Sequence, residues 1–405
     1  MIFYKNIQII TLRRNGMEKL RKSTFVLLLV ILTLPLCVCF PKSVVNAESK
    51  ISLDKIKNTT KAYYLVEEGT GEVLLSSNEN ERLKIASMVK IMSMLLVLEE
   101  IEKGTLSFDQ QVTISENAAK TGGSQIFLDK GSKHTIENLL KSVLVASAND
   151  SVVALSEIVA GSEENFVKKM NEKAKILGMN DTLFENATGL PTENQYSTAK
   201  DVSIMFRALI SHKKVFELGK IWTEDYVHPS GRSTIMTNTN KLVRFYDGCD
   251  MGKTGYTSGA KHCLSATAKR DDMRVIAVVI GANSSKERFY AVSSLFNYAF
   301  ENYENKAVIT KDTVVGKINV KGGRQKSVDL MPTSDVRVLT KKGENAEFST
   351  KICQNAIKSP IKKGDKVAKL EVNTKYGKKY YDLVSCSDVL KATYIDSIEN
   401  IFLGW

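Results

Sequence analysis

A helical block interrupts the β-sheet signal in the first part of this chain, and this order limits the possible folds. Residues 62–76 predict a β-hairpin, because two apolar runs flank the turn Gly69-Thr70-Gly71. Helical spacing of apolar residues follows in residues 91–101, 136–146, 151–160, 166–177 and 202–210. Strand patterns return at residues 263–268 and 274–280, before an amphipathic stretch at residues 287–300. The sequence therefore predicts an α+β domain with an antiparallel sheet and an inserted helical block.

The chain changes character beyond residue 305. Short alternating runs, separated by Gly and Lys, predict a small all-β domain over residues 306–388. In residues 389–405, large apolar side chains recur on one helical face, which predicts a short amphipathic C-terminal helix. Two interpretations of this helix stay open, namely packing on its own domain and binding at a membrane interface.

The N-terminus has the features of a secretory signal. Basic residues precede the apolar run 25–40, and Val45-Asn46-Ala47 suits signal peptidase. We predict a signal peptide over residues 1–47 and an exported protein, with an uncleaved membrane anchor as the alternative. Residues 1–47 hold seven Lys or Arg and one Glu, so their removal lowers the formal net charge from +12 to +6. No basic stripe interleaved with aromatic residues is present, so nucleic acid is not an expected partner.

Cysteine and histidine usage suggests neither a disulfide scaffold nor a metal site. Four widely spaced cysteines follow the predicted signal: Cys249, Cys263, Cys353 and Cys386. Export permits disulfides, but the sequence does not determine their pairing. The four histidines are scattered without ligand spacing, so we expect no metal and no cofactor.

The segment Ser87-Met88-Val89-Lys90 is the first candidate for chemistry. An S-x-x-K match alone is weak, since the chain repeats it at residues 52–55, 211–214 and 359–362. Ser87, however, directly precedes the apolar run 91–98, which places it at a helix start. An i, i+3 pair brings the Lys90 amine beside the Ser87 hydroxyl, and burial would lower the pKa of the amine so that it can accept the serine proton.

Two further segments complete a set of polar groups. Ser147 and Asn149 lie in a break between two predicted helices, where Ser147 can relay a proton between Lys90 and a leaving amine and Asn149 can hold a substrate backbone. The alternative for Ser147 is a helix N-cap. Ser115-Glu116-Asn117 is a rival S-x-N match that lacks the helix break.

Lys253-Thr254-Gly255 occurs once and is flanked by strand patterns. A strand beside the site would offer the Lys253 charge and the Thr254 hydroxyl to a substrate carboxylate, and Gly255 would let a peptide approach the backbone. A turn before Tyr256 is the alternative.

These three segments, in this order, resemble the penicillin-recognising serine enzymes, and among them the low-molecular-mass D-alanyl-D-alanine carboxypeptidases, which are penicillin-binding proteins. The resemblance covers essentially the whole chain after the predicted signal peptide, with local agreement at residues 85–90, 146–150, 186–191, 196–201, 238–242 and 252–255. It implies a β-lactamase/transpeptidase-like catalytic domain over residues 48–305.

The resemblance also implies a reaction. Ser87 would attack the D-Ala-D-Ala amide of a peptidoglycan stem pentapeptide, D-Ala would leave, and water would release the shortened peptide. Backbone N–H groups of Ser87 and His262 would form the oxyanion hole, and Arg288 would help to bind the terminal carboxylate unless it is a surface arginine at a helix start. The implied partners are stem peptides and, as covalent inhibitors, β-lactam antibiotics. The implied location is the cell wall or the outer face of the cytoplasmic membrane.

Two positions depart from the family pattern. Many relatives have histidine at the position of Thr188 and glycine at that of Ala148, and the first departure bears on deacylation.

Other functions share parts of this pattern. A β-lactamase of class A needs an E-x-x-L-N glutamate, which the sequence lacks. A peptidoglycan DD-endopeptidase would use the same chemistry, and a penicillin-binding sensor would need acylation alone. The sequence favours the carboxypeptidase.

Overall fold

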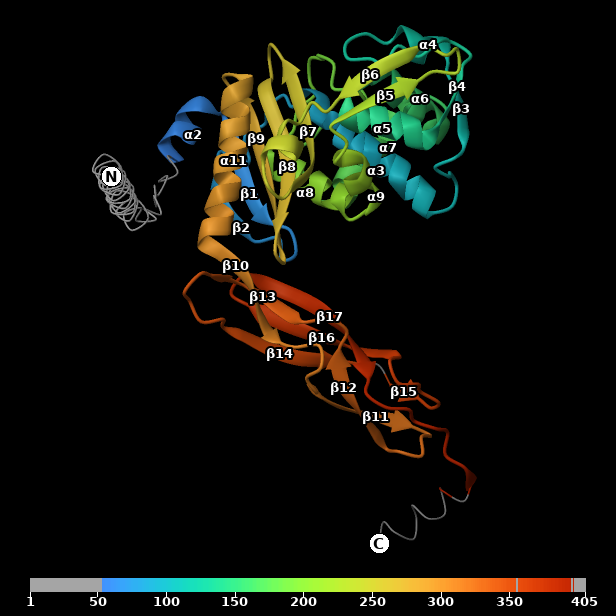
Figure 1. Ribbon diagram of the computed structural model, residues 1–405, viewed down its shortest axis with the longest axis vertical. Helices are drawn as coiled ribbons and strands as arrows, with labels where there is room; N and C mark the ends of the chain where they lie inside the picture. The colour runs from blue at the N-terminus through green and yellow to red at the C-terminus, as the bar shows by residue number, and fades with distance from the viewer. Residues whose placement is uncertain (1–52, 355, 395, 397–405) are drawn as a thin grey trace, which may run out of the picture. The chain divides into compact units, whose positions relative to one another are not determined.

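The computed structural model describes residues 53–354, 356–394 and 396 (Figure 1). The predicted signal peptide, residues 1–47, and most of the predicted tail helix, residues 389–405, lie outside these ranges. None of the helices formed by the described residues is long and apolar enough to cross a membrane.

Five antiparallel strands form the central sheet, in the order β2-β1-β9-β8-β7. Their bounds are β1 (Ala62–Glu67), β2 (Val73–Ser77), β7 (Cys249–Thr257), β8 (Lys261–Arg270) and β9 (Met273–Ala282). β1 pairs with β9 although the helical block separates them along the chain. This arrangement confirms the predicted antiparallel sheet interrupted by helices.

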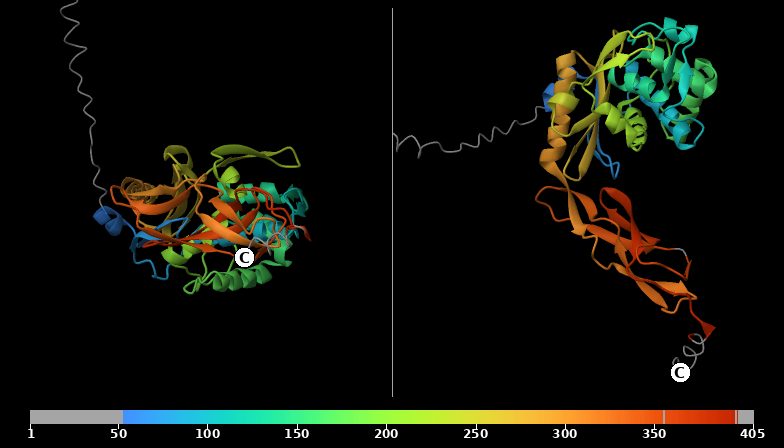
Figure 2. Two further views of the ribbon diagram at one scale, coloured as in Figure 1. Left: turned by 90° about the horizontal axis from the view of Figure 1, so that it is seen from below. Right: turned by 45° about the vertical axis from the view of Figure 1, so that its right-hand side comes forward.

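Both faces of the sheet are buried, each in a separate core. In β9, Ile276, Val278 and Ile280 belong to the core shared with the helical block. The alternate residues Val275 and Val279 belong to the core beneath α11 (Ser285–Asn302). Successive side chains of a strand point to opposite faces, so a strand covered on both faces is a continuous apolar run. Figures 1 and 2 show α11 on one face and the helical block on the other.

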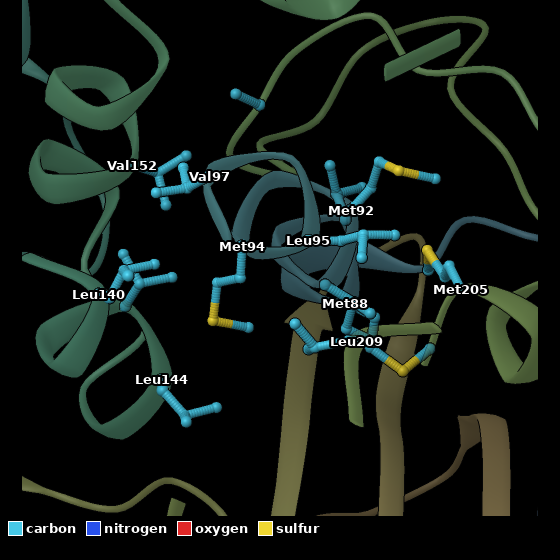
Figure 3. Packing of buried hydrophobic residues seen from close by; sticks show 14 of the residues in the cluster. Met88, Met92, Met94, Leu95, Val97, Leu140, Leu144, Val152, Met205 and Leu209 are labelled. Atoms are coloured by element: carbon cyan, nitrogen blue, oxygen red, sulfur yellow. The ribbon is translucent and has the colours of Figure 1, made fainter. Parts of the chain in front are cut away.

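One helix lies at the centre of the helical block. The block contains α3 (Lys90–Glu102), α5 (Ile136–Val145), α6 (Asn149–Ala160), α7 (Glu163–Ile176) and α8 (Ala199–Ile210). Residues 90–98 of α3 are all buried. In Figure 3, Leu140 of α5 and Val152 of α6 lie on one side of α3 and Met205 of α8 lies on the other. This packing fixes the start of α3, which carries Lys90.

Several short elements escape the sequence patterns. They are α2 (Leu53–Thr59), β3 (Gln111–Thr113), α4 (Glu116–Lys120), β4 (Lys133–Thr135), α9 (Lys214–Gly219), β5 (Thr223–Val227), β6 (Ser233–Thr237) and α10 (Leu242–Phe245). The hairpin strands β5 and β6 each bury a single residue, Tyr226 and Met236. So short an alternation gives too weak a signal to separate a strand from a loop.

The C-terminal part is all-β and has its own apolar core. β10 (Tyr303–Ile309) pairs with β13 (Val336–Lys341), and a six-stranded sheet has the order β14-β16-β17-β12-β11-β15. The strands of this sheet are β11 (Gly316–Lys321), β12 (Ser327–Pro332), β14 (Phe348–Cys353), β15 (Ile357–Lys358), β16 (Lys366–Thr374) and β17 (Gly377–Ser385). The predicted fold class, an α+β domain followed by a small all-β domain, is confirmed.

The four cysteines of the described chain are all free thiols. Cys249 and Cys263 are buried in the α+β domain, and burial raises the pKa of these thiols to about 12 and about 11. A thiol that stays protonated is a poor nucleophile. These cysteines therefore act as small apolar side chains.

Candidate active site

Ser87 lies in a short 3-10 helix, η1 (Ala86–Val89), that leads directly into α3. Lys90, the first residue of α3, donates a hydrogen bond from Nζ to Ser87 Oγ over 2.9 Å. The residue before the serine, Ala86, has a φ of 47°, in the left-handed region that non-glycine residues rarely adopt. Such strain at the residue that presents a nucleophile is typical of a functional site.

Lys90 is completely buried and lacks a carboxylate hydrogen-bond partner in the described structure. Burial first, and then the nearby Lys253 charge, lower the pKa of the Lys90 amine well below its ordinary value. Its second hydrogen bond goes to the backbone carbonyl of Thr188, 2.5 Å away. A neutral amine held beside a hydroxyl can accept a proton, as a general base must.

The loop that supplies the Thr188 carbonyl packs tightly against η1. Asn186 Oδ1 accepts the backbone N–H groups of Thr188 and Gly189 over 3.2 and 2.7 Å, which shapes the loop. Gly189 has a φ of +79°, and a Cβ there would collide with the Ala86 carbonyl and lie 2.8 Å from the Ser87 nitrogen. Only glycine allows this approach. Many relatives have histidine where this chain has Thr188. Because Lys90 contacts the backbone carbonyl at this position, the difference in side chain leaves the contact intact.

Ser147 pairs with Lys253 in the structure. Lys253 Nζ donates to Ser147 Oγ over 2.8 Å and to the Thr254 carbonyl over 2.9 Å. In the described structure the hydrogen-bond partner of the Ser147 hydroxyl is thus Lys253, and the predicted relay of a proton by Ser147 between Lys90 and a leaving amine stays a prediction. The N-cap interpretation of Ser147 is wrong, because Ala148 occupies the N-cap of α6 and no side chain caps it. Ser147 also has a positive φ, 62°.

Lys253 is the second buried lysine of the site. It is completely buried, and burial followed by the charge of Arg288 lowers the pKa of its amine to about 7. The charge on Lys253 therefore changes near neutral pH. This makes Lys253 suited both to binding a carboxylate and to exchanging a proton with Ser147.

Asn149 is the first residue of α6 rather than part of a loop tip, and it is 3% exposed. Its Nδ2 donates to the Gly122 carbonyl over 2.6 Å, while its buried Oδ1 has no hydrogen-bond partner. A buried acceptor without a partner is costly unless a ligand supplies the donor. The amide is thus oriented to accept an N–H group.

Asp150 is a residue that the sequence patterns missed. Its buried carboxylate accepts the backbone N–H groups of Ile126, Leu128 and Ser151 over 2.9 to 3.4 Å. Between them Phe127 has a φ of 62° and is 60% exposed. The sequence gives no signal of this, since an acidic residue in the first turn of a helix is ordinary. Asp150 fixes the loop that also carries the Gly122 partner of Asn149.

Thr254 and Gly255 lie within β7, so the alternative of a turn at this position is wrong. A Cβ on Gly255 would lie 2.6 Å from the Ile85 carbonyl oxygen and 3.2 Å from the Ser87 nitrogen. The missing side chain therefore lets η1 approach the strand, while the approach of a peptide to the Gly255 backbone stays a prediction. Thr254, at 7% exposed, is the neighbour of Lys253 on the same edge strand.

His262 and Arg288 differ from their expected places. His262 lies on β8, an inner strand, and its ring stacks on Tyr256 at a centroid distance of 4.5 Å. Arg288 is only 7% exposed, so the surface interpretation is wrong. It donates to the carbonyls of Gly255 and Cys263, both over 3.3 Å, and burial lowers its pKa to about 10. From α11, Arg288 thus supports β7 and β8 through one carbonyl of each strand.

The rival motif has a structural role. Ser115 is the N-cap of α4 and accepts the Ala118 N–H over 2.9 Å. Among the other S-x-x-K matches, Lys214 forms surface ion pairs with Glu137 and Glu217. Neither motif brings a buried amine to a serine.

Both parts of the chain match known protein families. Residues 47–284 match the family described as D-alanyl-D-alanine carboxypeptidase, and residues 303–391 match the C-terminal domain of penicillin-binding protein 5. The chain belongs to the D-alanyl-D-alanine carboxypeptidase family. It is 40% identical to the D-alanyl-D-alanine carboxypeptidase DacF of Bacillus subtilis over 87% of this chain and 91% of that protein.

Two solved structures illustrate the structural similarity of this chain to known proteins. The peptidoglycan synthesis regulatory factor PBP3 of Streptococcus pneumoniae is similar with a TM-score of 0.71 and 26% identity, covering 82% of this chain and 99% of that one. Penicillin-binding protein D2 of Listeria monocytogenes, solved in an ampicillin-bound form, is 30% identical with a TM-score of 0.54, covering 60% and 97%. A relative of this carboxypeptidase family member has thus been solved with a bound β-lactam.

Proposed function

We propose that this protein removes the terminal D-Ala from peptidoglycan stem pentapeptides through an acyl-enzyme on Ser87. The observation that carries the proposal is the buried Lys90 amine, with its lowered pKa, hydrogen-bonded to Ser87 Oγ. Incubation with a soluble pentapeptide ending in D-Ala-D-Ala tests it, because a carboxypeptidase releases free D-Ala. A sensor would form an acyl-enzyme with penicillin without releasing D-Ala from the peptide.

Acylation needs a base, a nucleophile and a stabilised oxyanion. Lys90 accepts the Ser87 proton while Oγ bonds to the carbonyl carbon of the penultimate D-Ala. The Lys253–Ser147 pair then supplies a proton to the departing amine, and the C–N bond breaks. Water then attacks the ester carbonyl carbon, and its proton returns to the Lys253–Ser147 pair, which had lost one to the amine. The protonated Lys90 gives its proton back to Ser87 Oγ as the C–O bond breaks, so the shortened peptide leaves and both groups are restored.

We assign the second oxyanion donor to Tyr256 in place of His262. The Gly255 carbonyl shares the Arg288 donor with the carbonyl of its β8 partner Cys263, so it faces β8, whereas the Thr254 carbonyl accepts from Lys253. Backbone polar groups alternate along a strand, so the Tyr256 N–H faces the free edge of β7, as the Thr254 carbonyl does. It joins the Ser87 N–H as a donor to the developing oxyanion.

Substrate binding uses the remaining polar groups. Lys253 in its charged form and the Thr254 hydroxyl bind the terminal carboxylate. Asn149 Oδ1, buried and unpartnered, accepts an N–H group of the stem peptide. Arg288 acts through the Gly255 carbonyl, so we propose it as a positioning residue of β7.

The pH dependence of kcat/KM should be bell-shaped. On the alkaline side the rate should fall as pH rises through about 7, because Lys253 loses the proton that attracts the carboxylate. On the acid side it should fall when Lys90 becomes protonated and can no longer act as base. The measurement is kcat/KM for D-Ala release across pH. The Lys253→Arg variant keeps its charge, so its alkaline fall should move upward; an unshifted alkaline limb would contradict the assignment to Lys253.

We further propose a division of labour between residues 48–305 and residues 306–388. All proposed catalytic groups precede residue 306, and residues 306–391 contain a separate apolar core. A chain that ends at Asn305 should therefore release D-Ala from a soluble peptide at close to the full rate. A truncated chain with native circular dichroism but no activity would show that the C-terminal domain contributes to the chemistry.

Cellular placement follows from the family and from the sequence. We propose that the protein is exported and acts at the outer face of the cytoplasmic membrane, with residues 389–405 lying on the bilayer by their apolar face. β-Lactams should acylate Ser87. Cleavage of crosslinks as a DD-endopeptidase remains the second candidate, since only the size of the leaving group differs.

A further inference from the structure

The charge of the chain is concentrated in its C-terminal domain. Residues 306–391 contain 19 Lys and Arg but nine Asp and Glu, a net charge of +10. Residues 48–305 contain 31 Lys and Arg and 33 Asp and Glu, a net charge of −2. So strong an asymmetry between two parts of one chain points to a polyanionic partner for the basic part.

Three chain segments bring much of this charge to one end of the domain. Lys321 of β11 and Lys358 of β15 are paired residues in the parallel ladder. Gly323 forms a bridge with Lys391, and the Arg324 N–H donates to the Leu390 carbonyl over 2.8 Å. We call the resulting cluster the basic collar; it comprises Lys321, Arg324, Lys326, Lys358, Lys362, Lys363 and Lys391.

The charges of the collar are free to meet a partner. All seven side chains are exposed. Within the described part of the chain, Arg324 alone of the seven has an ion pair, to Asp396 over 2.9 Å. Two other acidic residues lie among them, Asp365 and Asp388, and they accept the backbone N–H groups of Lys362 and Lys363. Seven cations against three carboxylates leave a net charge of about +4 by this count.

We propose that the basic collar is a docking surface for an anionic lipid bilayer. The collar surrounds the point where the chain passes into residues 389–405. Val389 is still buried in the core of the domain, but beyond it Leu390 is 57% exposed and Tyr394 is 82% exposed. Basic residues beside an amphipathic segment are the arrangement that binds anionic headgroups. A soluble phosphodiester polymer would match the charge but would give no role to the adjacent apolar side chains.

The collar and the tail should bind a membrane through different interactions. The tail itself carries few charges, so its binding by apolar burial should depend little on salt. The collar acts by charge, and its contribution is screened beyond about 8 Å at physiological ionic strength. Binding of the whole protein should therefore be salt-sensitive, and each exposed lysine should contribute about a fivefold factor at low salt.

A pair of charge-matched variants of the full mature chain tests the proposal. The first combines Lys326→Gln, Lys358→Gln and Lys362→Gln within the collar. The control combines Lys306→Gln, Lys351→Gln and Lys369→Gln, which are also exposed but lie outside the collar. Both lose three charges, so a difference between them reports location. Binding is measured by co-sedimentation with phosphatidylcholine vesicles that contain or lack phosphatidylglycerol.

The collar variant should bind anionic vesicles about ten- to a hundredfold more weakly than the control at low salt, and the two should converge at high salt. Equal binding by the two variants would overturn the proposal. Salt-independent binding by the unaltered chain would also overturn it, and this second test does not depend on whether a variant folds. Loss of binding to soluble polyphosphate without loss of binding to vesicles would assign the collar to a polymer instead. The inference rests on the proposed export, but D-Ala release from a soluble peptide, measured on the same samples, tests the enzymatic function separately.

Discussion

The Ser87→Ala variant should lose covalent labelling by a fluorescent penicillin and lower D-Ala release by at least about 10⁴-fold. Ser87 Oγ is the atom that forms the ester. Lys90 can act as base only toward a hydroxyl within hydrogen-bond reach, and its Nζ lies 2.9 Å from Ser87 Oγ. The other serine of the site, Ser147, is hydrogen-bonded to Lys253 and not to Lys90, so the variant has no hydroxyl beside the Lys90 amine in the described structure. Labelling is read on a denaturing gel, and turnover by D-Ala release.

The Ser211→Ala variant is the matched control for this experiment. Ser211 begins another S-x-x-K match, but its hydroxyl donates to the Ala208 carbonyl over 2.8 Å and its partner Lys214 forms ion pairs at the surface. This variant should label and turn over as the unaltered protein does. Labelling that survived in Ser87→Ala and vanished in Ser211→Ala would move the nucleophile to the other motif.

Local spacing explains why part of the site was predictable from the sequence. Ser87 and Lys90 are three residues apart at the start of an apolar helix, so helix geometry alone brings them together. The helical periodicity of residues 91–101 likewise predicted α3 to within a residue at each end. Such features depend on neighbours in the sequence, which the sequence displays directly.

The remaining contacts depend on how distant segments pack. Ser147 and Lys253 are 106 residues apart, and the sequence marks both as polar candidates without showing that they pair with one another. The Thr188 carbonyl is invisible to residue patterns because every residue has one. The same holds for the oxyanion donor: the choice between Tyr256 and His262 depends on which strand is at the sheet edge, and strand order is a long-range property.

Gly189→Ala should slow acylation by about 100-fold although it adds only one methyl group. The added Cβ would collide with the Ala86 carbonyl and lie 2.8 Å from the Ser87 nitrogen, so η1 or the Thr188 loop must move. A displacement of about 1 Å at a nucleophile can cost about 100-fold in rate. The variant also weakens the Thr188 contact that helps to hold Lys90. The measurement is the second-order rate constant of penicillin acylation.

Gly178→Ala separates this effect from the general cost of a left-handed alanine. Gly178 has a φ of +77°, close to the +79° of Gly189, but a Cβ there meets nothing within 4 Å. Both variants should lose about 1 kcal/mol of unfolding free energy from backbone strain, whereas only Gly189→Ala should acylate about 100-fold more slowly. If the two variants acylated equally well at matched stability, the contact between the Thr188 loop and η1 would not position the nucleophile, and the proposed role of that loop in holding Ser87 and Lys90 would be wrong.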